Sequence, residues 1–160
     1  MASAQGQPRR SSSNPSRRRS PRDVQRAVVL VDHGSRERAA NVQLTRIASA
    51  LRRRLAGRAV SVAHLSIAAP GLGEAIDACI ARGAREIVVV PYFLAPGRHA
   101  RHDVPRLARA AAARHPGVKL RVTAALGVHR GLVDAVEDRV IGVAGRARRA
   151  ARGASRAGSS

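Results

Sequence analysis

The sequence predicts an α/β protein, a single three-layer domain whose four-stranded parallel β-sheet carries helices on both faces. Two observations lead to this fold class. Short β-branched apolar runs, typical of buried strands, alternate four times with stretches whose apolar residues repeat at helical spacing, and such alternation forms a parallel sheet with right-handed crossovers. The chain has 160 residues, of which 44% are apolar, enough for one core and few for two domains.

The first half of the domain combines two strands with two helices. Residues 27–31 predict the first strand and residues 59–65 the second. A helix is expected over residues 37–55 with Ser35 as its N-cap, and another is expected to begin at Pro70. The apolar faces that predict these helices are formed by Leu44, Ile47, Ala48, Leu51 and Leu55, and by Leu72, Ala75, Ile76, Cys79 and Ile80.

The second half continues the alternation. A third strand is expected over residues 86–92, a helix over 103–114, a fourth strand over 119–124 and a last helix from about Leu132. The apolar face of the last helix consists of Val133, Val136, Val140 and Ile141. Four strands favour the flavodoxin-like order 2-1-3-4, in which the strand order reverses between strands one and three. Ligands of open parallel sheets bind at the carboxyl ends of the strands beside such a reversal.

The net charge of +20 is concentrated at the two ends of the chain. Residues 1–26 carry seven arginines and one aspartate, and residues 139–160 carry six arginines and no acid. We therefore expect a domain over 26–143, between a disordered basic tail over 1–25 and a second tail rich in Arg, Ala, Gly and Ser over 144–160. For the second tail, an extension of the last helix is the alternative. The N-terminal composition also suits an organellar transit peptide, and this alternative stays open.

Composition disfavours several classes of protein. A single cysteine, Cys79, allows no internal disulfide, so we expect a reducing, cytoplasmic location. Its place in an apolar helical stripe favours a small buried residue over a nucleophile. No apolar run approaches the roughly 18 residues of a membrane span. The chain carries no Gly-rich phosphate loop, so a nucleotide cofactor is not indicated.

Two histidines follow predicted strands at the reversal of strand order. His33 comes after the first strand, and His99 lies in the loop after the third. Neutral imidazole binds Co²⁺, Fe²⁺ or Ni²⁺ readily, and a site with few protein ligands keeps coordination positions open. Imidazole also acts as a general base near neutral pH. The pair therefore predicts a metal or proton-transfer site, although a single histidine at a strand end is more often a hydrogen-bonded structural residue.

Other polar residues lie at the same predicted edge of the sheet. Asp32 either orients an imidazole or caps the following helix. His64 ends the second strand and is a candidate pocket residue, and His129 follows the fourth strand. His102 and His115 have the sequence context of surface or helix-end residues.

Several motifs carry a resemblance to a known family. The most specific is the run over residues 90–99, Val-Pro-Tyr-Phe-Leu-Ala-Pro-Gly-Arg-His, followed by Asp-Val-Pro over residues 103–105. Further markers are Asp32-His33-Gly34-Ser35, Ala40-Asn41, Ala69-Pro70, Gly83-Ala84, His115-Pro116 and Leu126-Gly127. With these motifs, about residues 26–140 resemble the small type II chelatases, the cobalt or iron chelatases of sirohydrochlorin. The resemblance implies a chelatase-like α/β fold.

The resemblance also implies a function. It implies a metal chelatase, a lyase that inserts Co²⁺ or Fe²⁺ into sirohydrochlorin or a related polycarboxylated tetrapyrrole, without ATP, for cobalamin or sirohaem biosynthesis. The family's metal-binding and catalytic histidines fall on His33 and His99, and the divalent metal is a substrate. Longer members contain two such domains. By analogy, this chain is expected to form a homodimer whose cleft joins the sites of both subunits.

One departure concerns Ser66. Many members carry a metal-binding glutamate in the stretch that matches residues 63–68, and this chain has Ser66 there. A neutral hydroxyl is a poorer ligand for a divalent cation than a carboxylate, which puts metal preference and activity in question. The neighbouring His64 is a hypothetical replacement.

Substrate-binding residues are expected beside the two histidines. Arg36 and Arg98 are candidates because arginine pairs with carboxylates in bidentate geometry, although solvated loop arginines are the alternative in so Arg-rich a chain. Gly97 allows a flat ligand to approach the backbone closely. Ser35, together with His64 and Ser66, completes the candidate set.

Two other functions stay open at this point. A non-catalytic metal- or tetrapyrrole-binding protein of the same fold is the main alternative, with Ser66 as the mark of lost activity. Charge alone suggests nucleic-acid binding, but Tyr92 and Phe93 are the only aromatic residues and do not make a stacking platform. We therefore expect a tetrapyrrole and a second copy of the chain as partners, and neither a membrane nor a specific nucleic acid.

Overall fold

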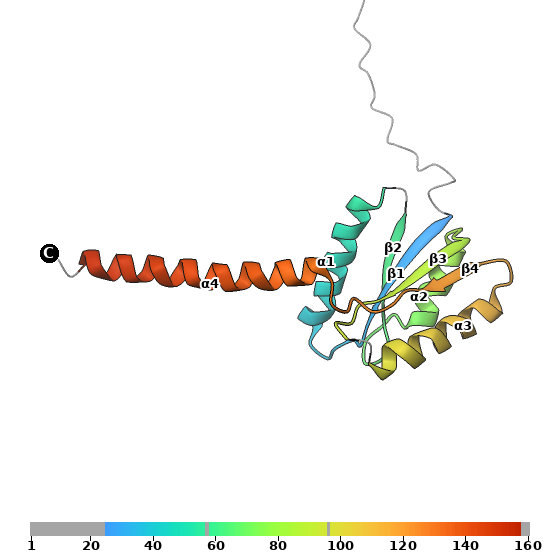
Figure 1. Cartoon of the computed structure of the whole chain (residues 1–160). Coiled ribbons are helices and arrows are strands. Elements are labelled where there is room, and N and C mark those ends of the chain that lie inside the picture. Colours follow the sequence, from blue (N-terminus) through green and yellow to red (C-terminus); the bar gives the residue numbers. More distant parts are fainter. Residues whose placement is uncertain (1–24, 57, 96, 158–160) are drawn as a thin grey trace, which may run out of the picture.

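The computed structural model describes residues 25–56, 58–95 and 97–157 (Figure 1). Strands and helices alternate along the chain, and one turn of π-helix, η1, precedes the third α-helix. The elements are β1 (Arg26–Asp32), α1 (Arg38–Arg54), β2 (Ala59–His64), α2 (Leu72–Ala81), β3 (Glu86–Pro91), η1 (His99–Asp103), α3 (Val104–Arg114), β4 (Lys119–Val122) and α4 (Arg130–Ala157). The predicted tail over 1–25 lies outside the described residues except for its last member.

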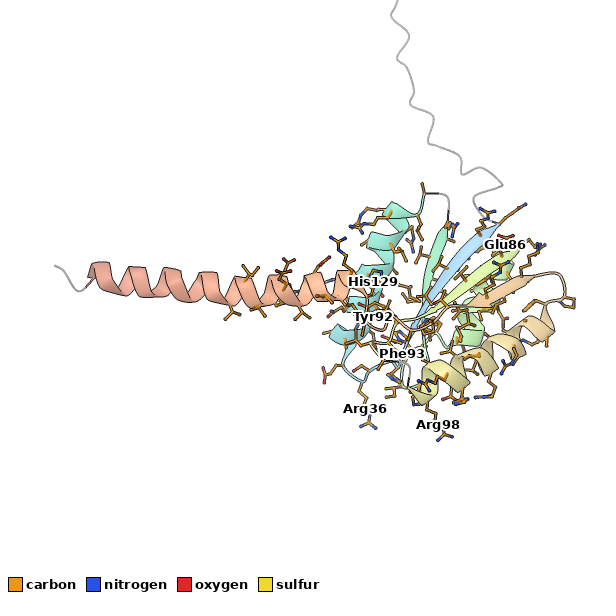
Figure 2. The ribbon with its side chains drawn as sticks, in the orientation of Figure 1. Arg36, Glu86, Tyr92, Phe93, Arg98 and His129 are labelled. Atoms are coloured by element: carbon orange, nitrogen blue, oxygen red, sulfur yellow. The ribbon has the colours of Figure 1, made fainter. Side chains whose placement is uncertain are left out.

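The four strands form one parallel sheet in the order β2-β1-β3-β4, which confirms the predicted fold class and order. In the register of the sheet, Val29 of β1 lies between Ser61 of β2 and Val89 of β3. All four carboxyl ends therefore meet at one edge. Figure 2 marks the opposite ends of β3: Glu86 lies at the amino edge, and Tyr92 and Phe93 lie at the carboxyl edge.

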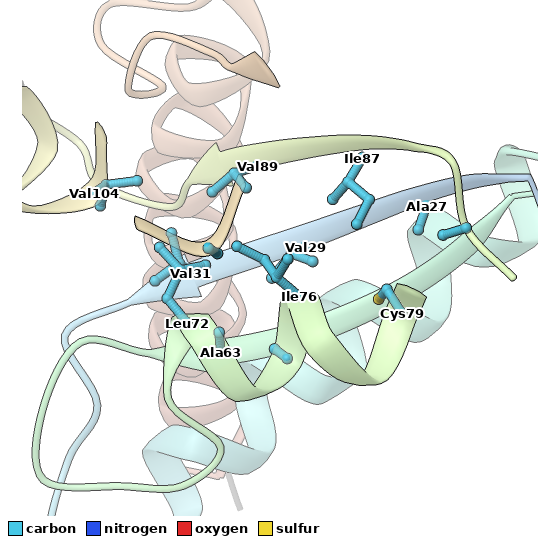
Figure 3. Packing of buried hydrophobic residues seen from close by; sticks show 13 residues of the cluster. Ala27, Val29, Val31, Ala63, Leu72, Ile76, Cys79, Ile87, Val89 and Val104 are labelled. Carbon is cyan, nitrogen blue, oxygen red and sulfur yellow. The ribbon is translucent and has the colours of Figure 1, made fainter. Parts of the chain in front are cut away.

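The larger buried cluster lies between the sheet and helices α2 and α3 (Figure 3). Alternate residues of β1 and β3 point into it because successive side chains of a strand face opposite sides of the sheet. Val29 and Val89 are both 0% exposed, and burial of each such side chain contributes about 1.5–3 kcal/mol. Ile76 of α2 and Val104 of α3, which pack against these strands, are also fully buried. This cluster anchors the strands whose carboxyl ends carry the loops.

A smaller cluster lies on the other side of the sheet, under α1. Val28 and Leu30 of β1, Val60 of β2, and Leu44 and Ala48 of α1 are all buried there. Helix α1 packs over β1 and β2. Leu44, Ala48, Leu51 and Leu55 of the predicted apolar stripe pack there, whereas Ile47 of the same stripe is exposed.

Two helix starts differ from the prediction. The N-cap of α1 is Glu37, and the hydroxyl of Ser35 instead accepts a hydrogen bond from the Glu37 backbone N–H at 3.0 Å. Helix α2 begins at Leu72 with Gly71 as N-cap, because the carbonyl of Pro70 is used by the His64 N–H at 2.9 Å. The Ser35 bond is a local turn between residues two apart, whereas the His64–Pro70 bond joins β2 to the loop before α2 and is not anticipated by sequence rules for helix starts.

Helix α4 includes the segment that the sequence left open between a tail and an extension of the last helix. It begins at Arg130, where the N–H of Gly131 donates to Nδ1 of His129 at 3.1 Å, and it continues through 28 residues to Ala157. Residues 144–157, expected as part of a tail, are helical. In Figure 1, α4 points away from the α/β domain. Within the described part of the chain, no helix combines the length and apolar character needed to span a membrane.

Candidate functional site

His33 and His99 lie together at the carboxyl edge of the sheet, where the strand order reverses. His33 directly follows β1, and His99 opens η1 after the loop from β3. The centroids of the two imidazole rings are 4.9 Å apart, and their planes cross at 81°. A metal–imidazole bond is about 2 Å long, so one ion placed between the rings can contact a nitrogen of each. The structure thus brings together the two residues that sequence reasoning singled out.

Phe93 supports the His33 ring. The two ring centroids are 4.5 Å apart with an angle of 46° between the planes, within the range favoured by aromatic pairs. Phe93 also packs against the larger buried cluster, so it connects His33 to the core. Phe93 belongs to the most specific sequence motif, but no signal in the sequence indicates its packing on His33.

Asp103 holds the ring of His99. Nδ1 of His99 lies 2.6 Å from a carboxylate oxygen of Asp103, and the imidazole donates this hydrogen bond because an ionised carboxylate only accepts. Nε2 is then the nitrogen left for a metal or a proton. The His99 side chain is 54% exposed, so the ring is accessible from solvent. Sequence reasoning assigned Asp103 only to a helix start, although its spacing of four residues from His99 was a usable signal.

Asp32 and His64 form a pair at the carboxyl ends of β1 and β2. Nδ1 of His64 lies 2.5 Å from a carboxylate oxygen of Asp32, and the same oxygen accepts the N–H of Gly34 at 2.9 Å. The His64 residue is only 4% exposed. Asp32 therefore orients an imidazole, as one of the two predicted alternatives had it, and that imidazole is His64. The burial of His64 does not suit the predicted contact with substrate.

Gly34 makes this close packing possible. Its φ is +77°, and a Cβ built there would lie 2.2 Å from the carbonyl oxygen of Ser66 and 3.0 Å from Cβ of His64. L-residues disfavour such a φ, and no side chain fits against a backbone oxygen at that distance. The loop after β1 and the loop after β2 can therefore lie side by side only with glycine at this position.

Ser66 lies directly beside the backbone of His33. Its N–H and its hydroxyl both donate to the His33 carbonyl, at 3.1 and 3.2 Å. Ser66 is exposed, so a longer side chain at this position has room to project toward solvent at the candidate site. The structure thus places the one noted departure from the chelatase pattern next to a candidate metal ligand.

The remaining predicted residues lie in the loops around the pair. Ser35 is tied to Asn41 by two hydrogen bonds, Ser35 N–H to the Asn41 side-chain oxygen at 2.9 Å and the Asn41 amide to the Ser35 carbonyl at 2.8 Å. Arg36, Gly97 and Arg98 are exposed. Figure 2 shows Arg36 and Arg98 at the edge that carries Phe93, with both side chains pointing out of the domain.

The pair of histidines supplies few ligands. Among the described residues, no group of three or more His, Cys, Asp or Glu side chains is placed to hold one metal ion. Two imidazoles with open coordination positions suit an ion that must be accepted and released, whereas structural metal sites are closed by four ligands. The arrangement can thus hold a divalent ion while it leaves coordination positions open for a second ligand.

Comparison with known proteins agrees with this geometry. The family model CbiX matches residues 27–143. The chain is 38% identical over 113 residues to the chloroplastic sirohydrochlorin ferrochelatase of Arabidopsis thaliana, which covers 71% of this chain and 50% of that protein. It is 29% identical to the sirohydrochlorin ferrochelatase of Bacillus subtilis, over 73% of this chain and 45% of that protein. The chain thus spans about half the length of these curated relatives.

Solved structures show the same fold. The sirohydrochlorin chelatase SirB from Bacillus subtilis subspecies spizizenii, in complex with cobalt, superposes with a TM-score of 0.70 at 27% identity, over 74% of this chain and 51% of that chain. A CbiX protein from Marinobacter aquaeolei, described as a putative cobalamin biosynthesis protein, superposes with a TM-score of 0.65 at 28% identity. That match covers 76% of this chain and 98% of the Marinobacter chain.

Proposed function

The chain belongs to the CbiX family, and on this premise we propose that it is a metal chelatase that inserts Co²⁺ or Fe²⁺ into sirohydrochlorin or a related polycarboxylated tetrapyrrole. The reaction needs no nucleotide and serves sirohaem or cobalamin biosynthesis. The observation that carries the proposal is the His33–His99 pair, with ring centroids 4.9 Å apart at the reversal of strand order.

Metal delivery is the first part of the proposed reaction. His33 and Nε2 of His99 hold the divalent ion, and the hydrogen bond from His99 to Asp103 keeps that ring in a metal-binding orientation. Two imidazoles fill only two coordination positions of the ion, whereas the macrocycle supplies four nitrogens. The difference in ligand number favours transfer from protein to tetrapyrrole.

Proton removal is the second part. Two pyrrole N–H protons must leave for each divalent ion that enters the macrocycle. An imidazole nitrogen that releases the metal regains its lone pair and accepts one of these protons, so the two histidines together account for both. Solvent at the exposed His99 then takes the protons away.

Substrate recognition depends on charge. The peripheral carboxylates of the macrocycle pair with Arg36 and Arg98, because a guanidinium binds a carboxylate through two parallel hydrogen bonds. Gly97 has no neighbouring heavy atom within 4 Å of a built Cβ, so a flat ligand can approach its backbone. Ser35 lies in the loop after β1 and Ser66 in the loop after β2, beside the two histidines. The buried His64 supports these two loops through its contact with Asp32.

Assembly and location belong to the same proposal. A second copy of the chain completes the substrate cleft, and the protein acts in the cytoplasm.

A non-catalytic binding protein of the same fold is the second candidate function. The observation in its favour is Ser66, whose neutral hydroxyl lies against the His33 carbonyl where many family members carry a carboxylate. Such a protein binds Co²⁺ or the tetrapyrrole and does not accelerate their combination.

An anaerobic absorbance assay separates the two functions. Metal-free sirohydrochlorin is mixed with Co²⁺ or Fe²⁺ and either the wild type, His33→Ala or His99→Ala. We expect metal insertion above the spontaneous rate with the wild type only. His102→Ala is the matched control, since His102 is an exposed histidine of the same helical turn with no assigned role. Folded wild-type protein that binds metal without accelerating insertion contradicts the chelatase proposal and favours the binding protein.

A further inference from the structure

A groove runs along the outer edge of β2, between α1 and α2, which pack on opposite faces of the sheet. We call it the β2 groove. Its volume of about 300 Å³ lies at the lower end of the range for small-molecule pockets, about 300–1,000 Å³. The described lining includes neither His33 nor His99, so the groove is separate from the candidate metal site. Its charged and hydroxyl side chains are Thr45, Ser49, Arg52, Ser61, Glu74 and Arg82.

Two arginines meet at this edge from opposite faces of the sheet. Arg52, in the last turn of α1, donates through Nη2 to the Val60 carbonyl at 2.6 Å. Arg82, the C-cap of α2, donates through Nη2 to the Ser61 hydroxyl at 3.2 Å. The ion pairs within the described part of the chain involve neither arginine. Two neighbouring cations repel each other, and an anion bound between them relieves that repulsion.

The backbone of Val62 adds a donor at the same edge. The Val60 carbonyl and the His64 N–H point outward from β2, because Arg52 and the Pro70 carbonyl bind them from that side. Backbone groups of alternate residues in a strand point to the same edge, so the N–H of Val62 also points outward, into the groove that Val62 lines. In the sheet of the described chain, β2 has a neighbouring strand only on its β1 side. The half-buried Val62 N–H is therefore free to bind a ligand oxygen.

The directions of these donors favour a tetrahedral anion. Arg52 reaches the edge from the α1 face and Arg82 from the α2 face, while the Val62 N–H lies between them in the plane of the sheet. A carboxylate presents two oxygens in one plane, whereas a phosphate monoester presents three terminal oxygens in three directions. Guanidinium groups bind phosphate oxygens through paired, charge-assisted hydrogen bonds. The three donors thus match the three terminal oxygens of a phosphate monoester.

The α1 side of the groove offers hydrogen-bond acceptors. The hydroxyl of Ser49 donates to the Thr45 carbonyl at 2.9 Å, and the hydroxyl of Thr45 donates to the Asn41 carbonyl at 3.4 Å. A hydroxyl has only one hydrogen to donate, so both oxygens are left as acceptors. The Glu74 carboxylate is likewise an acceptor and already binds the Gly71 N–H at 2.9 Å. This side of the groove therefore suits a ligand whose body carries hydroxyl groups.

We propose that the β2 groove binds a small phosphate monoester that carries hydroxyl groups. The phosphate lies between Arg52 and Arg82 and accepts the N–H of Val62, and the ligand hydroxyls donate to Thr45 and Ser49. The cavity of about 300 Å³ admits a phosphorylated small polyol. This site goes beyond the proposed chelatase activity and does not depend on it.

Calorimetric titration of the 160-residue chain with glycerol phosphate is the first test. The ionic strength is held constant, because a protein with a net charge of +20 attracts any anion. Arg52→Gln and Arg82→Gln are each expected to weaken binding about tenfold. Arg54→Gln is the matched control and is expected to bind like the wild type, since Arg54 is an exposed arginine of the same helix end and is not part of the described lining. Equal losses in all three variants, or no binding by the wild type, overturn the proposal.

Inorganic phosphate tests the ligand class, because it has the head group without the hydroxylated body. The wild type is expected to bind glycerol phosphate about tenfold more tightly than inorganic phosphate. The double variant Thr45→Val/Ser49→Ala is expected to lose this preference while its affinity for inorganic phosphate stays the same. Equal affinity of the wild type for the two probes, or a preference that survives the double substitution, overturns the proposed ligand class.

An NMR titration of isotope-labelled protein locates the site directly. The amide resonance of Val62 is expected to shift with glycerol phosphate and with inorganic phosphate, because its N–H donates to the phosphate in both cases. The amide of Val29, in the centre of the sheet, is expected to stay in place. A Val62 resonance that does not move while the calorimeter records binding overturns the proposal. Because these measurements use neither Co²⁺ nor sirohydrochlorin, a failure here is distinguishable from a failure of the chelatase assay.

Discussion

Nδ1 of His99 lies 2.6 Å from a carboxylate oxygen of Asp103, and one turn of π-helix carries both residues. Residues four apart lie on one face of a helix, so the Asp103 carboxylate lies beside the His99 ring. The π-helical turn that carries them continues directly into α3. Histidines that bind metals are commonly held in this way by a carboxylate on the second nitrogen. The relationship assigns Asp103 a positioning role toward His99.

Asp103→Asn is expected to lower the affinity for Co²⁺ about 10- to 100-fold, because the ring loses its charged acceptor and its fixed orientation. Titration with Co²⁺, followed by the absorbance of the bound ion, measures this. The pH at which metal binding reaches half its maximum should shift too, which a purely structural role does not predict. Asp77→Asn is a control, since Asp77 also contacts a histidine, His115, but lies away from the carboxyl edge. Unchanged Co²⁺ affinity in Asp103→Asn contradicts the positioning role.

Ser66→Glu is expected to raise the affinity for divalent metal, because it adds a carboxylate beside the His33 backbone, to which Ser66 now donates two hydrogen bonds. Equilibrium titration with Co²⁺ and Fe²⁺ under anaerobic conditions gives the change for each ion. Ser66→Gln adds nearly the same volume without charge. If Gln raises the affinity as much as Glu, the effect does not come from a new ligand.

Gly34→Ala is expected to destabilise the fold by about 1–3 kcal/mol, because the substitution combines a positive φ with a backbone oxygen 2.2 Å from the new Cβ. Urea unfolding followed by circular dichroism measures the loss. Gly73→Ala should show no such loss. Gly73 lies in helix α2, and a Cβ built there meets only a side-chain nitrogen of Arg114, at 3.6 Å. Equal stability of the two variants contradicts the role given to Gly34.

His64→Ala is expected to cost about 1–3 kcal/mol of stability, because it removes the buried imidazole that pairs with the half-buried Asp32 carboxylate and leaves only the Gly34 N–H on that oxygen. Metal affinity should fall far less than in His33→Ala, because His64 supports the loops from below. Denaturation and Co²⁺ titration of the same two variants separate these effects. A loss of metal binding as large as that of His33→Ala, in a folded protein, shows that His64 is a ligand.

Asp77 predicts a pH dependence of stability. Burial raises the pKa of this carboxyl and is the largest single influence on it, but the hydrogen bonds and positive charges of His115 and Arg114 together outweigh it, so the pKa of Asp77 lies below its usual value of 3.8. A lowered pKa in the folded state means that the contribution is fully present above about pH 4 and is lost as the pH falls through the folded-state pKa. Since the Asp77 side chain is 43% exposed, the contribution stays below about 1 kcal/mol.

Comparison of Asp77→Asn with the wild type by denaturation at several pH values tests this prediction. The wild type should be the more stable protein near pH 6, and the difference should vanish in strong acid. Asp134→Asn is a control with a single long ion-pair contact of 3.8 Å to Arg130. A difference at Asp77 that does not change with pH contradicts the assignment.

Much of the fold was predictable because its signals are local. The alternation of strands and helices favours the strand order that the sheet has, and this order places the loops of His33 and His99 at one edge. The helix boundaries depend on hydrogen bonds between segments that are separate in the sequence. Pro70 does not begin α2, because its carbonyl accepts the His64 N–H from a neighbouring segment.

The internal arrangement of the site was less predictable. His64 and His33 both follow strands of the same sheet edge, and nothing in the chain distinguishes the buried ring from the exposed one. The difference comes from Gly34, which lets two loops approach so closely that Asp32 meets His64. Pairing of His99 with Asp103 was within reach of sequence reasoning through their four-residue spacing, whereas packing of Phe93 on His33 joins two loops that only the folded sheet brings together.

The separation of the two histidines along the chain has a thermodynamic consequence. His33 and His99 come together only after β1 and β3 have paired, with β2 and α2 between them in the sequence. The unfolded chain therefore holds no preformed pair, and a divalent ion that binds both rings binds the native state alone. By mass action, free metal at 100 times its dissociation constant adds about 2.7 kcal/mol to the free energy of unfolding. A shift of the melting temperature with Co²⁺ concentration is thus a direct measure of metal affinity, without any tetrapyrrole present.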